Sequence, residues 1–276
     1  MSALTTTATR TVRGAPARRG VTLPRVLAAE WTKLTSVRST GWLALGTVAA
    51  VAATAYGLGL FVRAGDGRSG TWVVTSGAVA AQIGLLVLGV LVGTGEHSTG
   101  TARVTFTAVP RRLPVLTAQA AVTAVASALA SAVALGASSL ATAGVRASVP
   151  VPLDLAEPGA ARALVGFVVL GTGMALLGLG LGSLLRRPAD ALVAGMVLVV
   201  VVDPMLATNP GRVTDTLRAL LPGSGGRLVQ DDAALAVLDA ATKGPHLGPW
   251  GGTAVLAAWV LVALAAAAFR LRRRDV

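Results

Sequence analysis

The chain has 276 residues, of which 54% are hydrophobic and only 13% charged, and its formal net charge is +12. Soluble domains carry about 25% charged residues, so the low charge and the long uncharged apolar runs predict a polytopic membrane protein. The absence of cysteine from the sequence excludes disulfides, thiolate metal sites and a cysteine nucleophile.

The first forty residues are polar and basic. Residues 1–21 are rich in Thr, Ala and Arg and lack the apolar core of a secretory signal, so we expect a disordered cytosolic tail rather than an organelle transit peptide. Residues 22–40 predict an amphipathic helix that lies in the membrane interface, although an ordinary cytosolic lead-in to the first span is an alternative. Its expected apolar face consists of Leu23, Leu27, Trp31 and Leu34.

Six apolar runs follow, each long enough to cross the ~30 Å hydrocarbon core as a helix. We expect spans at about 41–62, 72–95, 114–145, 163–185, 188–207 and 249–269. The fifth contains Asp203, whose carboxylate is tolerable only near the headgroups, so we expect Asp203-Pro204 to mark the point where that helix leaves the membrane.

Two glycine pairs have the GxxxG spacing that lets membrane helices approach closely, Gly89 with Gly93 and Gly178 with Gly182. A glycine-rich composition without a specific helix partner explains them equally well.

The distribution of charge orients the spans. With both termini and the loops at 96–112 and 186–190 on one side, that side carries the whole net charge, and the charges of the other side balance. The positive-inside rule makes the basic side cytosolic. We therefore expect an all-α membrane protein with an N-terminal interfacial helix, both termini cytosolic and a basic tail at 270–276. The basic residues follow the span ends, where membrane lipid is their partner, so no nucleic acid is expected.

The sequence lacks the usual signs of an enzyme. It has no GxxxxGK[ST] phosphate-binding loop, no HExxH motif and no histidine with an acid at metal-ligand spacing. Ser138 and Ser139 lie in a predicted span without a base to activate them. We therefore expect no catalytic residue, no metal site and no cofactor bound by this chain.

Three segments carry a family resemblance. Residues 25–42 contain the pattern E-W-x-K-L-x-S-x-R-S-x-x-W, residues 95–112 read GEHSTGTARVTFTAVPRR, and residues 220–229 read LLPGSGGRLV. In this order they resemble the permeases of bacterial type-2 ATP-binding-cassette transporters, especially those of actinobacteria. His97 stands where an aromatic residue is more usual in the second pattern.

The resemblance implies a permease, with export favoured, that pairs with a separate ATP-binding subunit and a second, identical or different, permease chain in the bacterial plasma membrane. ATP and Mg would bind in the partner subunit. The segment 95–112 would dock on that subunit, the N-terminal helix would pack beside it, and spans two and five would line the transport path with Gln82 as a polar contact. The implied ATPase contacts are Glu96, Thr99, Arg103, Phe106, Arg111 and Arg112, and the interfacial helix contributes Glu30, Trp31 and Lys33.

Other classes of function remain open at this point. The main alternative is a non-transporting membrane scaffold or regulatory protein. An intramembrane enzyme is a third alternative, although the predicted spans lack a base. An uncoupled channel or carrier is a fourth. A proton-driven carrier would keep ionisable groups at membrane depth, where this chain has only Asp203.

Overall fold

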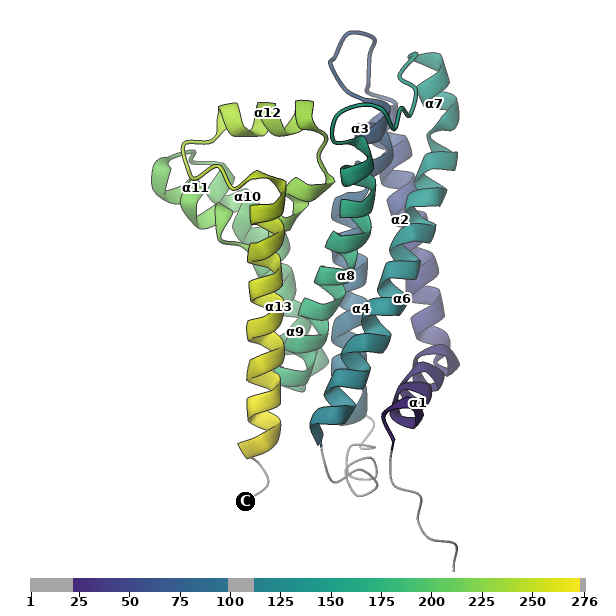
Figure 1. The fold of residues 1–276 in the computed structure, drawn as a ribbon, viewed down its shortest axis with the longest axis vertical. Coiled ribbons are helices and arrows are strands. Elements are labelled where there is room, and N and C mark those ends of the chain that lie inside the picture. The colour runs from purple at the N-terminus through teal and green to yellow at the C-terminus, as the bar shows by residue number, and fades with distance from the viewer. Residues whose placement is uncertain (1–21, 99–111, 274–276) are drawn as a thin grey trace, which may run out of the picture.

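The fold is that of a computed structural model, which describes residues 22–98 and 112–273 (Figure 1). No strand occurs in this part of the chain. In chain order the elements are α1 (Leu23–Ser36), α2 (Arg38–Gly59), α3 (Gly70–Thr75), α4 (Ala78–Ser98), α6 (Arg112–Ala141), α7 (Ala143–Ser148), α8 (Ala160–Leu185), α9 (Pro188–Met196), the π-helix η1 (Val197–Val201), α10 (Val202–Ala207), α11 (Arg212–Ala219), the 3-10 helix η2 (Pro222–Val229), α12 (Asp232–Ala241) and α13 (Gly248–Arg273).

Six helical stretches of the described residues are long and apolar enough to cross a membrane, which confirms the predicted fold class. They are Arg38–Gly59, Gly70–Gly95, Leu113–Ala141, Ala160–Leu185, Pro188–Ala207 and Gly248–Arg272. The third is shorter than the expected 114–145, because α6 ends at Ala141 and α7 follows after Thr142. The side of the membrane on which the termini lie stays a prediction.

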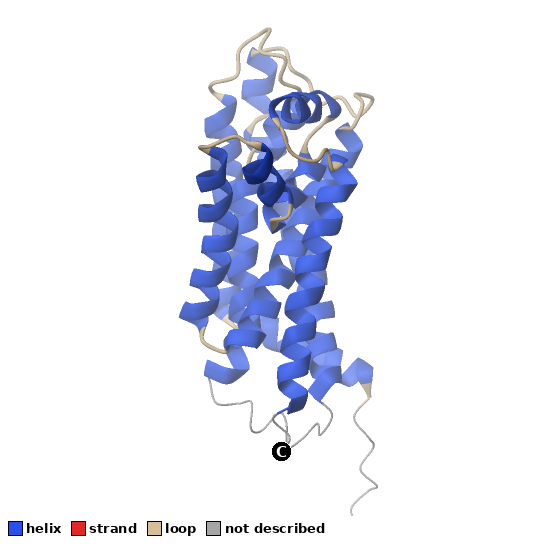
Figure 2. Cartoon of the chain, turned by 90° about the vertical axis from the view of Figure 1, so that its left-hand side faces the viewer, coloured by secondary structure: helices blue, strands red, loops and turns tan. Residues whose placement is uncertain are grey.

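The spans run side by side as one bundle (Figure 2). Within it, α4 and α8 make the most extensive contact of any two helices. Leu85 and Leu86 of α4 pack with Phe167 and Met174 of α8 in the main apolar core. More than half of the apolar window is buried in the second and fourth spans, against 11% in the fifth. The fifth span is therefore the one most open to its surroundings.

The two GxxxG pairs face each other across α4 and α8, so they are packing motifs and not merely composition. A Cβ atom added to Gly89 would lie 1.9 Å from the carbonyl oxygen of Ala175, and one added to Gly178 would lie 2.2 Å from that of Leu86. A Cβ atom added to Gly93 would lie 2.5 Å from the carbonyl oxygen of Leu179, and one added to Gly182 would lie 2.7 Å from that of Val90. Only glycine lets these two backbones touch.

A row of buried hydroxyls runs along α6. Ser127 donates to the carbonyl of Thr123 at 2.7 Å, and Ser131 donates to that of Ser127 at 2.8 Å. Ser138 reaches across to the second span and donates to the carbonyl of Val74 at 2.6 Å. These bonds satisfy polar groups that would be costly in an apolar bundle.

The fifth span departs from the expected geometry around Pro204. Proline has no N–H to offer the carbonyl four residues earlier, and its ring crowds that turn. The five residues of η1, which end three positions before Pro204, form a π-helix, a usual accommodation for such a defect. The helical stretch ends at Ala207, as the expected bounds 188–207 have it. That Asp203-Pro204 marks the point where this helix leaves the membrane stays a prediction.

The N-terminal helix buries only part of the expected face, because Leu27 and Leu34 are partly buried but Leu23 and Trp31 are not. Val26 and Leu27 pack against Val115 and Ala118 of α6, whereas Leu23 and Trp31 are exposed. The helical spacing of the larger residues predicted the helix correctly, but the side that contacts α6 is the one that carries Val26.

The bundle has two distinct ends (Figure 1). The α1 end holds α1, the α8–α9 turn, the C-terminal end of α13 and the ends of α4 and α6 that flank residues 99–111. The α12 end holds α3, α7, α11 and α12. The described residues that border or form the four predicted cytosolic elements thus share one end of the bundle.

Candidate functional site

The predicted ATPase-docking residues fall largely outside the described part of the chain. This is the case for Thr99, Arg103, Phe106 and Arg111. The backbones of Glu96 and Arg112 belong to the last turn of α4 and the first residue of α6, while their side chains lie outside the description. What the structure places is therefore the two helix ends between which the docking segment runs.

The predicted residues of α1 lie close to these helix ends. The Nζ atom of Lys33 is 2.6 Å from Oε1 of Glu30, whose side chain is buried, while Trp31 is exposed. The Val26 face of α1 packs on the first turns of α6, so the buried Glu30 lies in a helix that is held against the start of α6. Sequence spacing alone did not indicate that Glu30 is buried.

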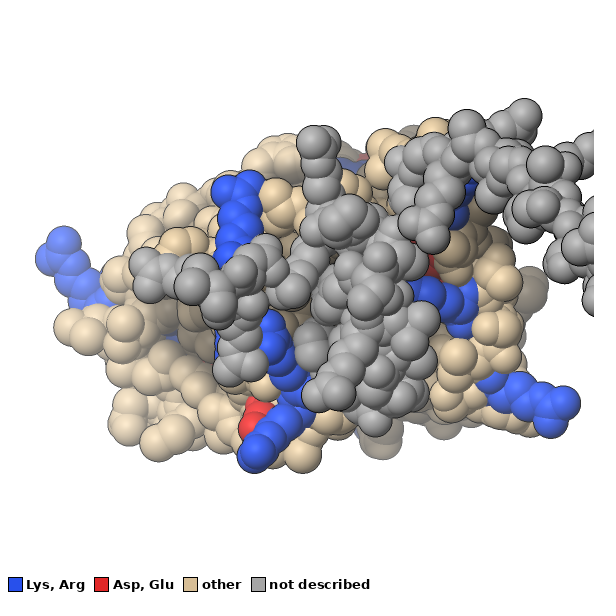
Figure 3. All heavy atoms as spheres, turned by 90° about the horizontal axis from the view of Figure 1, so that it is seen from below, with Lys and Arg blue, Asp and Glu red and all other residues tan. Residues whose placement is uncertain are grey.

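The α8–α9 turn completes this end of the bundle. Arg186 has a left-handed backbone with φ of +65° and caps α8, its N–H donating to the carbonyl of Gly182. Arg270 of α13 donates to the carbonyl of Leu184 and so joins the C-terminal helix to the same turn. Figure 3 shows this face, on which Lys and Arg side chains lie at several points around its border and Asp or Glu are few.

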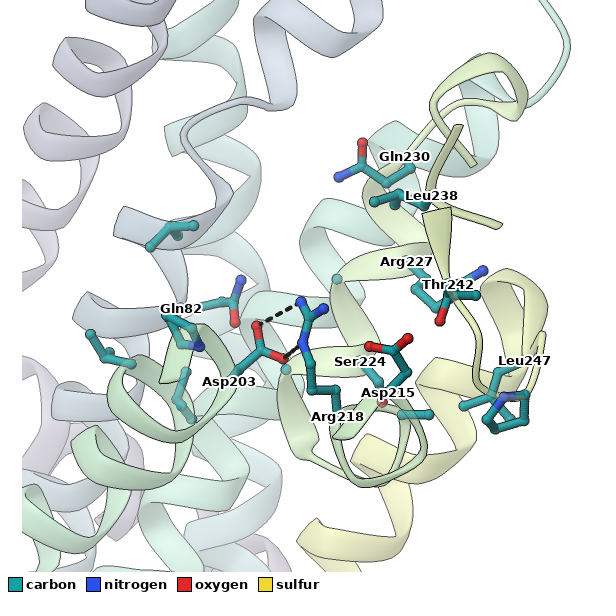
Figure 4. A pocket seen from close by; sticks show the side chains of 18 of the residues that line it. Gln82, Asp203, Asp215, Arg218, Ser224, Arg227, Gln230, Leu238, Thr242 and Leu247 are labelled. Atoms are coloured by element: carbon teal, nitrogen blue, oxygen red, sulfur yellow. Dashed lines mark hydrogen bonds and ion pairs between the residues drawn. The ribbon is translucent and has the colours of Figure 1, made fainter. Parts of the chain in front are cut away.

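A cavity of about 410 Å³ lies toward the opposite end, between the second span, the fifth span and the segment that follows it (Figure 4). The second span contributes Val79, Gln82 and Ile83, and the fifth contributes Val199 and Asp203. Residues of α11, η2 and α12 form the other walls. Spans two and five, with Gln82, thus both line a hollow of the molecule. That this hollow belongs to a transport path stays a prediction.

An ion pair crosses this cavity. Nε of Arg218, on α11, lies 3.1 Å from Oδ1 of Asp203, on α10, and both side chains are about one-third exposed, at 37% and 32%. Figure 4 shows the guanidinium and the carboxylate facing each other beside Gln82. Because an unpaired carboxylate is costly at the edge of a membrane span, the position of Asp203 called for a basic partner that sequence reasoning did not identify.

The rim of the cavity is held by further polar contacts. Asp215 is buried and accepts a hydrogen bond of 2.9 Å from the backbone N–H of Lys243. Asp239 is paired with Arg227 and lies 3.5 Å from Nδ1 of His246. Partial burial acts to raise the pKa of the Asp239 carboxyl, but the hydrogen bonds and charges of Arg227 and His246 outweigh it and lower that pKa from its ordinary value of 3.8.

Further contacts join the rim of the cavity to helices at the α12 end of the bundle. Asp231 caps α12 by accepting from the N–H of Ala234, and it also accepts a hydrogen bond from the hydroxyl of Ser69, the cap of α3. Arg162, near the start of α8, lies 2.7 Å from Asp232. The segment after the fifth span is therefore fixed to the second and fourth spans.

The cavity combines paired charges with uncharged polar groups and apolar walls. Its charged residues pair within the protein, and Gln82, Ser224 and Gln230 add uncharged polar groups beside valine and leucine walls. Among residues 22–98 and 112–273 no group of three His, Asp or Glu could hold a metal ion.

Comparison with known proteins adds no family assignment, because the sequence matches no protein-family model and no curated protein. The resemblance to transporter permeases therefore rests on the three sequence patterns. The function has to be argued from those patterns together with the arrangement of the helices.

Proposed function

We propose that the chain is the membrane-spanning permease subunit of an ATP-driven transporter, with export favoured, and that residues 95–112 couple it to a separate ATP-binding subunit. The six apolar helices are those of a polytopic membrane protein. The three sequence patterns support the finer assignment, since they lie in the order in which the permease family has them.

One observation carries the proposal, namely the course of α4. Near one end α4 lines the cavity with Gln82, and at its other end it carries Glu96, directly before the proposed docking segment. Fourteen residues separate the two, about 21 Å of helix. Between them, Gly89 and Gly93 hold the α4 backbone against α8. A push at the docking segment would thus be carried to the cavity by two helices in backbone contact.

The proposed transport cycle follows from this connection between the docking segment and the cavity through α4 and α8. ATP binding would close a pair of partner subunits, which hold the ATP and Mg, and would displace the docking segments of two permease chains, identical or different. The six-helix bodies would then tip between inward-facing and outward-facing states. A cargo would bind in the cavity beside Gln82 in one state and leave it in the other.

The test is a pull-down of the tagged protein in mild detergent from its own host cells. We expect a stoichiometric ATP-binding chain with ATPase activity to co-purify. Replacing residues 96–112 by a Gly/Ser linker should abolish the association, and Phe106→Lys should abolish ATP-driven transport while membrane insertion stays normal.

The matched control replaces residues 64–68, the loop before α3 at the opposite end, by a linker of the same composition. It should retain the ATP-binding chain. A clean preparation with no such chain in several detergents, or normal transport with both Glu96→Lys and Phe106→Lys, would contradict the proposal and favour a scaffold protein.

A further inference from the structure

The cavity beside Gln82 has an electrically balanced lining. Its charged residues are two aspartates, Asp203 and Asp215, and two arginines, Arg218 and Arg227. A ligand with a net charge of either sign therefore meets no net attraction from these four groups. A lining of this kind favours a ligand whose own charges also sum to zero.

Two of these four charges are open to a ligand. Asp215 is only 5% exposed and accepts a backbone hydrogen bond of 2.9 Å. Arg227 is 17% exposed and is paired with Asp239 behind the cavity wall. Asp203 and Arg218, by contrast, are each about one-third exposed and pair with each other. A ligand in the cavity would therefore meet one carboxylate and one guanidinium, side by side.

The pair of Asp203 and Arg218 keeps hydrogen-bonding capacity for a ligand. Nε and Nη2 of Arg218 donate to Oδ1 and Oδ2 of Asp203 at 3.1 and 3.4 Å (Figure 4). Nη1 of Arg218 donates to none of the residues that the structure describes. Each carboxylate oxygen of Asp203 can accept a further bond. Because the two side chains touch, the ligand charges that match them must also be neighbours, as are the ammonium and carboxylate on the two sides of one carbon in an α-amino acid.

A ligand with a single charge fits this pair poorly. An anion that binds Arg218 competes with Asp203 and leaves that carboxylate with less compensation at the end of a membrane span. A cation that binds Asp203 does the same to Arg218. A zwitterion brings a counter-charge for each side chain, so both stay compensated. The pair therefore selects a ligand that carries both charges.

Gln82 adds an uncharged polar group deep in the second span. It is twelve residues from Gly70, where that span begins, and therefore about 18 Å along the helix. Within the described part of the chain its amide has no hydrogen-bond partner. An amide at this depth is costly without a polar partner. Figure 4 shows Gln82 beside the ion pair, where its amide can bond to the polar end of a ligand.

Apolar side chains form the wall next to Gln82. Val79 and Ile83 lie on the same face of α4 as Gln82, and Val199 of η1 adds to this wall. The volume of about 410 Å³ lies toward the small end of the range of about 300–1,000 Å³ that is typical of ligand pockets. The cavity thus suits a small molecule with a zwitterionic end and an apolar side chain.

We propose that the cavity binds an apolar α-amino acid. Its carboxylate contacts Arg218, its ammonium contacts Asp203, and its side chain packs on Val79, Ile83 and Val199. As an assignment of the cargo, this inference rests on the proposed transport function, whereas the binding itself rests on the cavity alone. The headgroup of phosphatidylethanolamine also joins an ammonium to an anion, but with a wider separation, so the test includes it.

The test is equilibrium binding of tritiated L-leucine and L-phenylalanine to the purified full chain in detergent. We expect saturable binding. N-acetyl-L-leucine lacks the ammonium and isopentylamine lacks the carboxylate, so each should compete with tritiated L-leucine about tenfold more weakly than unlabelled L-leucine does. Dihexanoyl phosphatidylethanolamine is the competitor that represents a lipid headgroup, and it should also be weaker.

Variants of the ion pair assign the binding to this cavity. Arg218→Gln should abolish saturable binding. Since it also leaves Asp203 unpaired, the double variant Asp203→Asn with Arg218→Gln is the second test, because it removes both charges together and should fold but not bind. Arg212→Gln, an exposed arginine of α11 outside the lining, is the control and should bind L-leucine as the natural chain does. A single symmetric peak in gel filtration shows that each variant is folded.

Three results would overturn the proposal: no saturable binding of either amino acid, equal competition by the analogues with one charge, or unchanged binding by the double variant. Stronger competition by dihexanoyl phosphatidylethanolamine than by L-leucine would also overturn it, in favour of a lipid headgroup. The assay contains no ATP-binding chain. Failure of the pull-down would therefore leave a measured affinity standing, and failure of the binding assay would leave a co-purified ATP-binding chain standing.

Discussion

At the scale of single residues, the pair of Asp203 and Arg218 explains how a carboxylate is tolerated at the end of a membrane span. The two groups belong to successive helices, and the turn at 208–211 brings them together across the cavity. Because each is about one-third exposed, their attraction is weaker than that of a buried pair and stronger than that of a fully solvated one. The pair fixes α11 to the fifth span and so defines one wall of the cavity.

Removing one partner should cost more than removing both. Arg218→Gln leaves the carboxylate of Asp203 without its counter-charge and should lower the free energy of unfolding by about 1–2 kcal/mol. The double variant Asp203→Asn with Arg218→Gln leaves neither charge and should recover a large part of that loss. Thermal unfolding in detergent measures both.

Arg212→Gln, an exposed arginine on the same helix, is the control and should change stability by less than about 0.5 kcal/mol. Strictly additive single losses in the double variant would show that Asp203 and Arg218 do not interact.

At the scale of elements, the contact of α4 with α8 organises the bundle. Its glycines remove side chains where the backbones meet, and the larger residues Leu85, Leu86 and Phe167 fill the space beside the contact. Close approach and dispersion drive helix association in lipid, where the hydrophobic effect between helices is small. The specific pairing of α4 with α8 therefore depends on both the glycines at the backbone contact and the large apolar residues beside it.

Replacing Gly178 by valine should disrupt this contact. The new Cβ would lie 2.2 Å from the carbonyl oxygen of Leu86, a backbone atom that can move only with α4 itself. Overpacking of this kind costs about 1–3 kcal/mol or more. We expect a clearly lower melting temperature or aggregation in fluorescence-detected gel filtration.

Gly136→Val in α6 is the matched control, since a Cβ atom there would meet nothing within 4 Å. Both variants carry the same change of helix propensity. An equal loss of stability in the two would contradict a steric role of Gly178.

The elements show which features of this molecule can be predicted from sequence. Uncharged runs of membrane length predicted all six spans, since hydrocarbon demands a continuous apolar helix. The π-helix around Val197–Val201 was missed, because it is a local response to Pro204 that has no hydrophobic period of its own. In the site, Gln82 was predicted from an expected lining helix, whereas Arg218 and Arg227 were not, because their partners are set by the fold of a polar segment.

At the scale of the whole molecule, the two ends of the bundle differ in charge, and this difference predicts the orientation of the protein in the membrane. All elements that the positive-inside rule assigns to the cytosol lie at the α1 end, where basic residues border the bundle (Figure 3). At the α12 end, acids and bases pair with each other, as Arg162 does with Asp232 and Arg227 does with Asp239. Helix α4 thus runs from a basic end of the bundle to an end at which acids and bases pair.

The predicted orientation can be measured with single cysteines in intact cells. Ala156→Cys should react with a membrane-impermeant maleimide from outside, whereas Asp275→Cys should react only after permeabilisation. Ala175→Cys, buried in α8, should stay unlabelled in both conditions. Labelling of Asp275→Cys in intact cells would reverse the orientation and would place the proposed docking segment outside.

The glycine contact between α4 and α8 also constrains how the protein is made. A ribosome delivers the second span to the membrane before the fourth has been synthesised, and the whole of α6 lies between them in the chain. Until α8 has been inserted, Gly89 and Gly93 lack the backbone that covers them in the folded bundle. The bundle centre is therefore completed late in biosynthesis, and a chain that stops after its third span would leave this surface of α4 without its partner helix.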